Sequence, residues 1–145
     1  MPREDPATLP DFAPGTVAVL STGAGAPHAI PVSTAVRVSD TRLVLALARR
    51  RESLRRLRED PRAALTIMAG GDIALTAHCE VTILEDPMAI SDRVAALRLD
   101  VVRLQDHGQP RFVIEEGVRW RWTDPDAERR DAEIRAALRA LSASR

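Results

Sequence analysis

Apolar and polar residues alternate along residues 73–84, and this is the clearest pattern in the chain. Alternate positions of an extended strand share one face, so a period of two is typical of a strand with one buried face. One face comprises Ile73, Leu75, Ala77, Cys79, Val81 and Ile83, and the other holds Thr76, His78, Glu80 and Thr82. The pattern therefore predicts a strand in which the Cys79 thiol is buried and His78 points away from it.

Further runs of aliphatic and β-branched residues predict strands at 16–21, 28–38, 42–48, 62–69, 111–115 and 118–123. The run at 42–48 is apolar at almost every position, which indicates a central strand covered on both faces. Short glycine-rich or polar turns follow several of these runs, at 23–25, 39–41 and 70–72. Tight turns between consecutive strands predict antiparallel pairing.

Three segments carry the signals of helices. Residues 52–59 are highly charged and end at Asp60-Pro61, which a helix does not readily pass. Apolar residues at three- and four-residue spacing predict a helix over 87–104, and they are Ile90, Val94, Leu97, Val101 and Leu104. Asp124 can cap a third helix over 125–141, with Pro125 at its first position and Ile134, Leu138 and Leu141 on its buried side.

The order of these elements predicts one domain spanning residues 1–145, which includes an N-terminal arm at 1–15 with a helical turn near 7–12. Short consecutive strands with tight turns, interrupted by a few helices, are typical of an antiparallel barrel. We therefore expect a mainly β, α+β fold. The chain shows no internal repeat and no linker that would indicate a second domain.

Composition excludes several classes of protein. The 145 residues are 45% hydrophobic and 29% charged, as in folded domains. Because no apolar run approaches about 20 residues, and the start MPREDPATLPDF lacks an apolar signal core, we expect a cytoplasmic protein without a membrane partner. The 21 basic and 21 acidic residues give no net charge, which argues against nucleic-acid binding. A single cysteine excludes an internal disulfide.

The strongest candidate for a binding site is a cluster of arginines. All 21 basic residues are arginine, and seven of them lie between positions 49 and 62. Arg49, Arg50 and Arg51 separate the strand at 42–48 from the helix at 52–59. The start of a helix offers free N–H groups and a positive dipole end, and guanidinium groups match phosphate oxygens. The sequence therefore predicts a phosphate site here. The alternative is an ordinary solvated helix face with surface ion pairs of little energy.

Histidine and tryptophan positions offer weaker candidates. His28 follows a turn, and we favour a hydrogen-bonded strand-edge role over acid–base catalysis. His78 and Glu80 have no further ligand at a usable spacing, so we predict no metal site. Trp120 and Trp122 suit either core and interface packing or stacking on a ligand ring. No Walker loop, Gly-x-Ser-x-Gly or Gly-x-Gly-x-x-Gly motif occurs, so NTPase, hydrolase and Rossmann functions have no support.

Three stretches, TVAVLSTGAGAPHAIPVS at 16–33, LVLALARRRESLRRLREDPRAALTI at 43–67 and VRWRWTDP at 118–125, resemble the FMN-binding split-barrel family, the pyridoxamine 5′-phosphate oxidase-like proteins. They correspond to its opening hairpin, its phosphate segment and its closing strand, and their order is more specific than any one motif. The resemblance implies a split β-barrel and a homodimer with two cofactor sites at the subunit interface. It implies FMN, or the deazaflavin F420 in some branches, or haem in a few members, and His107 is the haem-ligand candidate only by elimination.

The same resemblance assigns cofactor contacts to individual residues. Val32, Ser33 and Thr34 would lie along the ring and ribityl chain, and Ala46 and Leu47 would supply backbone contacts. Arg51, Ser53 and Arg55 or Arg56 would meet the phosphate. The family's phosphate-binding lysine falls at Ser53, whose hydroxyl brings no charge, so we expect Arg49, Arg50 or Arg56 to compensate.

The resemblance leaves three functions open. The first is an FMN- or F420-dependent oxidoreductase acting on an unknown small molecule, with no dedicated catalytic residue because the flavin itself carries the hydride chemistry. The second is a flavin- or haem-binding protein without catalysis. The third is a barrel that has lost its cofactor, for which Ser53 is the main argument.

Overall fold

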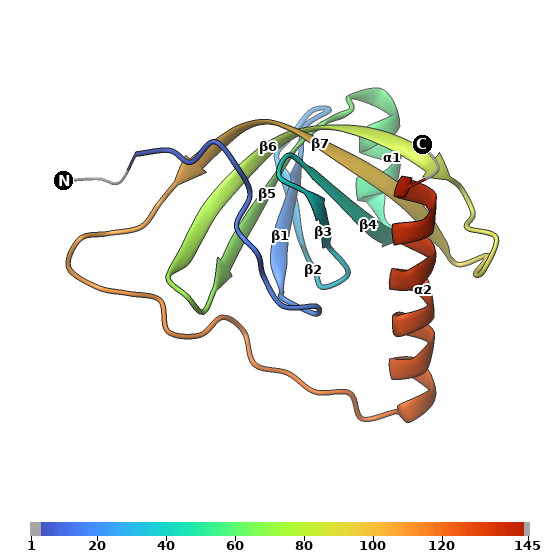
Figure 1. Ribbon diagram of the computed structural model, residues 1–145. Helices are drawn as coiled ribbons and strands as arrows, with labels where there is room; N and C mark the ends of the chain where they lie inside the picture. Colours follow the sequence, from blue (N-terminus) through green and yellow to red (C-terminus); the bar gives the residue numbers. More distant parts are fainter. Residues whose placement is uncertain (1–3, 144–145) are drawn as a thin grey trace.

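The structure is a computed structural model that describes residues 4–143, and it forms one antiparallel sheet with two helices (Figure 1). Its elements are β1 (Ala18–Thr22), β2 (His28–Val32), β3 (Val36–Ser39), β4 (Arg42–Ala48), α1 (Glu52–Glu59), β5 (Arg62–Ala69), β6 (Ile73–Glu85), β7 (Val94–Asp106) and α2 (Pro125–Ala143). The seven strands lie in the order β2-β1-β5-β6-β7-β4-β3. The predicted antiparallel α+β fold is confirmed, but the edge strands β2 and β3 do not pair, so the sheet is not a closed barrel.

Strand β4 is buried on both faces, as its apolar composition predicts. Leu43, Leu45 and Leu47 pack into the main core on one face. Val44 and Ala46 face a second cluster formed with α2 on the other. Since apolar area removed from water stabilises a fold by about 25 cal/mol per Å², the double burial anchors the end of β4 from which the arginine-rich turn departs.

Helix α2 forms as predicted and covers one side of the sheet (Figure 1). The Asp124 carboxylate accepts a hydrogen bond from the backbone N–H of Asp126 at 2.9 Å, which confirms its capping role. Leu138 is fully buried, and Ile134 and Leu141 pack beside it against β3 and β4. Among residues 4–143, no helix combines the length and the apolar character that a membrane crossing requires.

The predicted helix over 87–104 is wrong, because residues 94–106 form β7, a long strand between β6 and β4 (Figure 1). The spacing of Val94, Leu97 and Val101 fits a helix, but in β7 Val94 packs toward the α2 cluster and the other two pack toward the main core. Ala95, Leu97 and Leu99 are all fully buried on one face of β7. A period of two was therefore present, but the small Ala95 concealed it. Pairing with strands distant in sequence decides the conformation.

The predicted strands at 111–115 and 118–123 are also wrong, since residues 107–124 form an irregular loop. This loop docks on the β5–β6 turn, where Asp72 and Ile114 exchange hydrogen bonds: the Asp72 N–H donates to the Ile114 carbonyl, and the Ile114 N–H donates to the Asp72 carboxylate. The polar backbone groups of the loop form single hydrogen bonds of this kind, and they do not form the regular hydrogen-bond ladder of a strand pair.

Two smaller expectations also need correction. The run at 28–38 divides into β2 and β3, because residues 33–35 leave the sheet between them. No helical turn forms at 7–12, where Leu9 is instead buried and its N–H donates to the Asp40 carbonyl.

Substitution of Gly117 by alanine is expected to undock the 107–124 loop. A Cβ atom at Gly117 would lie 2.4 Å from the Met68 carbonyl oxygen, so one backbone must move. Overpacking of this kind costs roughly 1–3 kcal/mol. Thermal melting and limited proteolysis should report a lower Tm and faster cleavage within the loop. Glu115→Ala, a change at an exposed neighbour, should leave both unchanged; equal effects from the two variants would contradict the close approach.

Candidate functional site

The arginine-rich turn lies between the buried end of β4 and the start of α1. The Arg49 N–H still donates to the Arg93 carbonyl, and the Arg51 N–H donates to the Ala48 carbonyl, which closes the turn. Arg51 is the N-cap of α1 in an extended conformation, and its side chain makes no capping hydrogen bond. The first N–H groups of α1 are therefore available to an anion.

An open hollow of about 780 Å³ lies beside this turn. Its lining comprises Arg49, Arg50, Arg51, Glu52, Leu54, Arg55, Arg58 and Asp86. Five guanidinium groups thus face two carboxylates, and the positive end of the α1 dipole adds to the excess of positive charge. The hollow is large enough for a small ligand.

Two of the arginines have no ion-pair partner within the described part of the chain. Arg50 is exposed and Arg51 half-buried, and neither approaches a carboxylate. Arg55, by contrast, donates to Glu59 at 3.1 Å and lies 3.4 Å from Glu52. Arg50 and Arg51 are consequently the lining arginines most available to an added anion.

Asp86 bridges the remaining two arginines of the hollow. Arg49 Nε donates to Asp86 Oδ1 at 2.5 Å, and Arg58 Nη2 donates to the other carboxylate oxygen. Burial by itself would raise the pKa of Asp86. The hydrogen bonds and charges of Arg49 and Arg58 outweigh it and hold the pKa below its ordinary value. Asp86 is therefore ionised at neutral pH.

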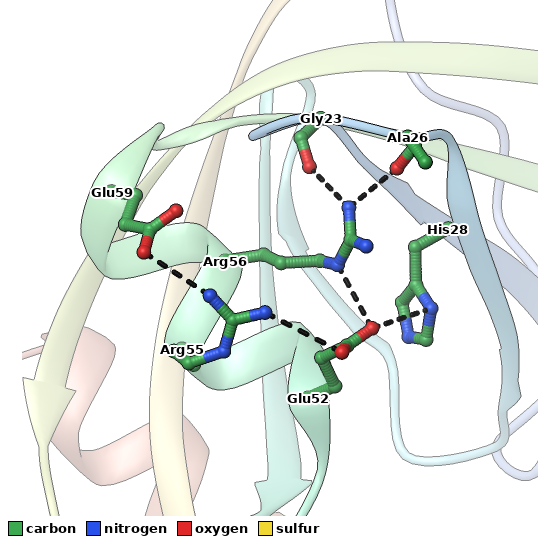
Figure 2. A network of polar contacts seen from close by, with 7 residues as sticks. All are labelled: Gly23, Ala26, His28, Glu52, Arg55, Arg56 and Glu59. Carbon is green, nitrogen blue, oxygen red and sulfur yellow. Dashed lines mark hydrogen bonds and ion pairs between the residues drawn. The ribbon is translucent and has the colours of Figure 1, made fainter.

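Arg56 lies outside the hollow and holds the β1–β2 turn against α1. Figure 2 shows its Nη1 atom reaching the carbonyl oxygens of Gly23 at 2.7 Å and Ala26 at 2.5 Å. Its Nε donates to Glu52 at 3.0 Å, and its side chain is only 11% exposed. Protein acceptors thus occupy the guanidinium of Arg56, which is one of the three arginines that we expected to compensate for the family lysine.

His28 belongs to the same polar network (Figure 2). Its Nδ1 lies 3.2 Å from Glu52 Oε2, which confirms the expected hydrogen-bonded role at a strand edge. The hydrogen bond and charge of Arg56 lower the pKa of Glu52, burial opposes the shift, and His28 and Arg55 add to the lowering. The network joins β2, the β1–β2 turn and α1.

Ser53 does not line the hollow. Its side chain is fully buried, and its hydroxyl has no hydrogen-bond partner among residues 4–143. The position that the resemblance assigns to a cationic phosphate ligand thus holds a small buried group here. Positive charge comes instead from the preceding turn.

The residues predicted to contact a ring and ribityl chain surround an incompletely paired part of β4. Pairing of β3 with β4 ends at Val36 and Val44, so residues 45–48 have a strand neighbour only on the β7 side. The Thr34 hydroxyl approaches the open side and donates to the Ala46 carbonyl at 2.7 Å. Val32, Ala46 and Leu47 are buried, whereas Ser33 and Thr34 are half-buried. None of these five residues belongs to the lining of the arginine hollow.

Sequence reasoning missed Arg58 and Asp86 as lining residues. Arg58 had a detectable signal, since Arg51, Arg55 and Arg58 recur at helical spacing on one face of α1. Asp86 had none, because it is 37 residues from Arg49 along the chain. Ion pairs with α1 neighbours, expected for a solvated helix face, occur at Arg55, whereas Arg58 pairs across the fold.

The other candidate side chains serve the fold. His78 and His107 lie on the sheet's outer side, where their Nε2 atoms contact Gln105 and Thr76, each at 2.8 Å. Burial raises the pKa of the Cys79 thiol to about 12, helped by the charge of Asp100, so the thiol is protonated and unreactive.

Trp120 and Trp122 pack edge to face with ring centroids 5.0 Å apart. The Trp120 indole N–H donates to the Gly15 carbonyl at 2.8 Å, which ties the 107–124 loop to the N-terminal segment. Both rings line a second hollow of about 650 Å³ beside α2. Stacking on a ligand ring, one of the two roles that the sequence left open for these residues, stays untested beside packing in the core or an interface.

This antiparallel sheet of seven strands with two helices matches the fold of solved flavin split-barrel proteins. The resemblance to pyridoxamine 5′-phosphate oxidase-like proteins is confirmed at the level of the fold, by solved structures that match the chain with probability 1.00. No protein-family model matches the sequence, and a search of curated proteins finds no match.

Three solved structures illustrate the likeness. A pyridoxamine 5′-phosphate oxidase-like protein from Listeria innocua has a TM-score of 0.54 and 13% identity, over 65% of this chain and 90% of the other. The flavin reductase component of a bacterial tryptophan halogenase has a TM-score of 0.54 and 12% identity, over 66% and 81%. An F420 reductase has a TM-score of 0.54 and 13% identity, over 63% and 90%. At identities this low, the structural likeness establishes a common fold. It does not establish a common activity, which has to be argued from the residues of the site.

Proposed function

We propose that this protein binds a flavin-type cofactor, FMN or F420, through the arginine hollow and acts as an oxidoreductase on a small molecule. The observation that carries the proposal is the pair of cations at the start of α1, Arg50 and Arg51, which have no ion-pair partner among the described residues. Solved structures of the same fold include a flavin reductase component and an F420 reductase, which supports a cofactor of this kind.

The lining of the hollow fits a phosphate group. Guanidinium groups bind phosphate oxygens through paired N–H donors, and backbone N–H groups at a helix start add further donors. Arg50 and Arg51 would bind the phosphate together with the first N–H groups of α1. Ser33 and Thr34, beside the incompletely paired part of β4, would lie along the remainder of the cofactor.

The chain itself supplies binding and orientation. A bound flavin supplies hydride transfer, which needs no protein acid or base. The buried strand β4 holds the arginine turn in place, and the Arg56 clamp fixes the β1–β2 turn against α1. These contacts would hold the cofactor in one orientation and exclude water from one side of it.

We also propose that the protein is a homodimer. Several large apolar side chains of the 107–124 loop and of β5 are between 42% and 65% exposed, namely Met68, Phe112, Val113, Val118 and Trp120. The backbone of Gly117 lies against that of Met68, which brings this part of the loop beside β5. Exposed apolar patches of this kind mark interfaces, and a second copy of the chain is the commonest partner.

The double substitution Val113→Asp/Val118→Asp is expected to convert a dimer into a monomer, because it places two charges in the proposed interface. Size-exclusion chromatography with light scattering gives the mass directly. Ile90→Asp, at an equally apolar exposed position in the β6–β7 connection, is the control and should remain dimeric. A monomeric wild-type protein would contradict the proposal.

An absorbance titration tests the cofactor. We expect FMN or F420 to saturate the purified protein, and the reduced cofactor to be oxidised when a substrate panel is added. Saturable binding without turnover would favour a carrier. Binding of haem alone, or of no cofactor, would overturn the proposed function.

A further inference from the structure

Asp86 is the only carboxylate of the hollow that comes from outside the α1 region, within the described residues. It follows the last residue of β6 and reaches the turn and α1 from the β6–β7 connection. Its two oxygens are divided between Arg49 and Arg58. The carboxylate side chain is 13% exposed, whereas the two arginines are 44% and 52% exposed.

This arrangement holds an anion between two cations at the place where we propose that a ligand anion binds. A carboxylate and a phosphate satisfy guanidinium N–H groups in the same way, through paired oxygens. Asp86 therefore occupies two of the donor groups that a phosphate would use. Both guanidinium groups remain accessible from solvent, although Arg49 Nη1 also donates to the Asp92 carbonyl at 3.4 Å.

We propose that Asp86 is an internal competitor for the ligand's anionic group, and that it sets both the affinity and the anion selectivity of the site. The inference rests on the proposed function. In the free protein the single negative charge of Asp86 is shared between Arg49 and Arg58 and offsets one of their two positive charges, and a bound phosphate takes at least one of these guanidinium groups from it.

Selectivity follows from the charge balance of the exchange. A ligand carboxylate that replaces Asp86 exchanges one single negative charge for another, so the arginines gain little. A phosphate monoester carries about two negative charges at neutral pH, so its attraction to Arg49, Arg50, Arg51 and Arg58 exceeds that of Asp86. The site would consequently favour a phosphate over a carboxylate.

The alternative role for Asp86 is to position Arg49 and Arg58 for the ligand. The two roles make opposite predictions. Removal of a competitor strengthens anion binding, whereas removal of a positioning group weakens it. A substitution that keeps the size of Asp86 and removes its charge distinguishes them.

The chain offers a matched control for this test. Asp100 also bridges two arginines, Arg42 at 2.8 Å and Arg98 at 3.0 Å, but it lies on β7 and does not line the hollow. Burial by itself would raise the pKa of Asp100, as it would that of Asp86, but the hydrogen bonds and charges of Arg42 and Arg98 hold this pKa below its ordinary value. Asp100→Asn therefore removes the same charge and the same type of double ion pair elsewhere in the fold.

The experiment measures FMN binding by flavin fluorescence for the wild type, Asp86→Asn, Asp86→Ser and Asp100→Asn, after circular dichroism has shown which variants fold. The Asp86 variants are expected to bind FMN about tenfold more tightly, equivalent to roughly 1.4 kcal/mol, and Asp100→Asn within about twofold of the wild type. In wild-type protein, inorganic phosphate should displace FMN at concentrations at which acetate does not.

Each outcome decides the inference. Unchanged or weaker binding in the Asp86 variants, or equal gains in the Asp86 and Asp100 variants, would overturn it and leave the proposed cofactor function standing. In the wild-type protein alone, displacement of FMN by acetate as effectively as by inorganic phosphate would also overturn the inference. Failure of wild type and variants alike to bind FMN, F420 or phosphate would overturn the proposed function as well.

Discussion

Reversing the charges of Arg50 and Arg51 together, in Arg50→Glu/Arg51→Glu, is expected to weaken FMN binding by a factor of roughly 10² to 10⁴. Each hydrogen bond between charged groups contributes about 1.5–3 kcal/mol, and among residues 4–143 neither arginine has an ion-pair partner that would compete. The introduced carboxylates would also repel the phosphate. Fluorescence titration of the variant and the wild type at one ionic strength measures the effect.

The fold should survive this change, because Arg50 is exposed and Arg51 half-buried in a surface turn. Arg129→Glu/Arg130→Glu is the matched control, since it makes the same change in charge on the exposed side of α2. It should alter FMN affinity by no more than about threefold. Equal losses in the two variants would show that net charge, and not the hollow, governs binding.

Truncation of Leu99 to alanine is expected to cost about 2–5 kcal/mol of unfolding free energy. Leu99 is fully buried on β7, where it pairs with Leu43 of β4 and Val81 of β6. Such a loss is a large share of a total stability of about 5–15 kcal/mol. Denaturant unfolding followed by circular dichroism measures the difference.

Val102→Ala is the control for Leu99, because Val102 is 63% exposed on the same strand. Its cost should stay below about 0.5 kcal/mol. The pair also separates the strand from the helix that periodicity predicted over 87–104, since Leu99 is not among the residues of the apolar stripe of that helix. A small cost at Leu99, similar to that at Val102, would contradict the position of β7 in the sheet.

The elements that the sequence predicted correctly are those with local signals. Alternation along residues 73–84 marked β6, Asp60-Pro61 marked the end of α1, and Asp124 marked the start of α2. Each signal depends on residues that are close along the chain. The fold class followed from the order of these elements.

The errors concern segments whose conformation depends on distant partners. β7 is a strand because it lies between β6 and β4. The segment 107–124 is irregular, and single hydrogen bonds hold it in place, such as those from Ile114 N–H to Asp72 and from the Trp120 indole to Gly15. Leu97, Leu99 and Val101 alternate with polar residues in β7, but the apolar spacing there also fits a helix, and local periodicity predicted strands in 107–124 that do not form.

In the candidate site, too, the sequence indicated the residues that are close along the chain and did not indicate the contacts between distant ones. Arg49, Arg50 and Arg51 are contiguous and were found from the sequence, and the structure brings them together in one hollow. The ion pairs of Asp86 span 37 and 28 residues, and the contact of Arg56 with Gly23 spans 33. Residue types along the chain do not indicate which distant group a side chain will meet.

The most direct test of the phosphate site compares FMN with riboflavin, which differs from FMN only in lacking the phosphate. We expect FMN to bind at least about tenfold more tightly than riboflavin at low salt, and this advantage to shrink as salt screens the arginine charges. Equal affinities for FMN and riboflavin, at low and at high salt, would contradict the assignment of the arginine hollow to the cofactor phosphate.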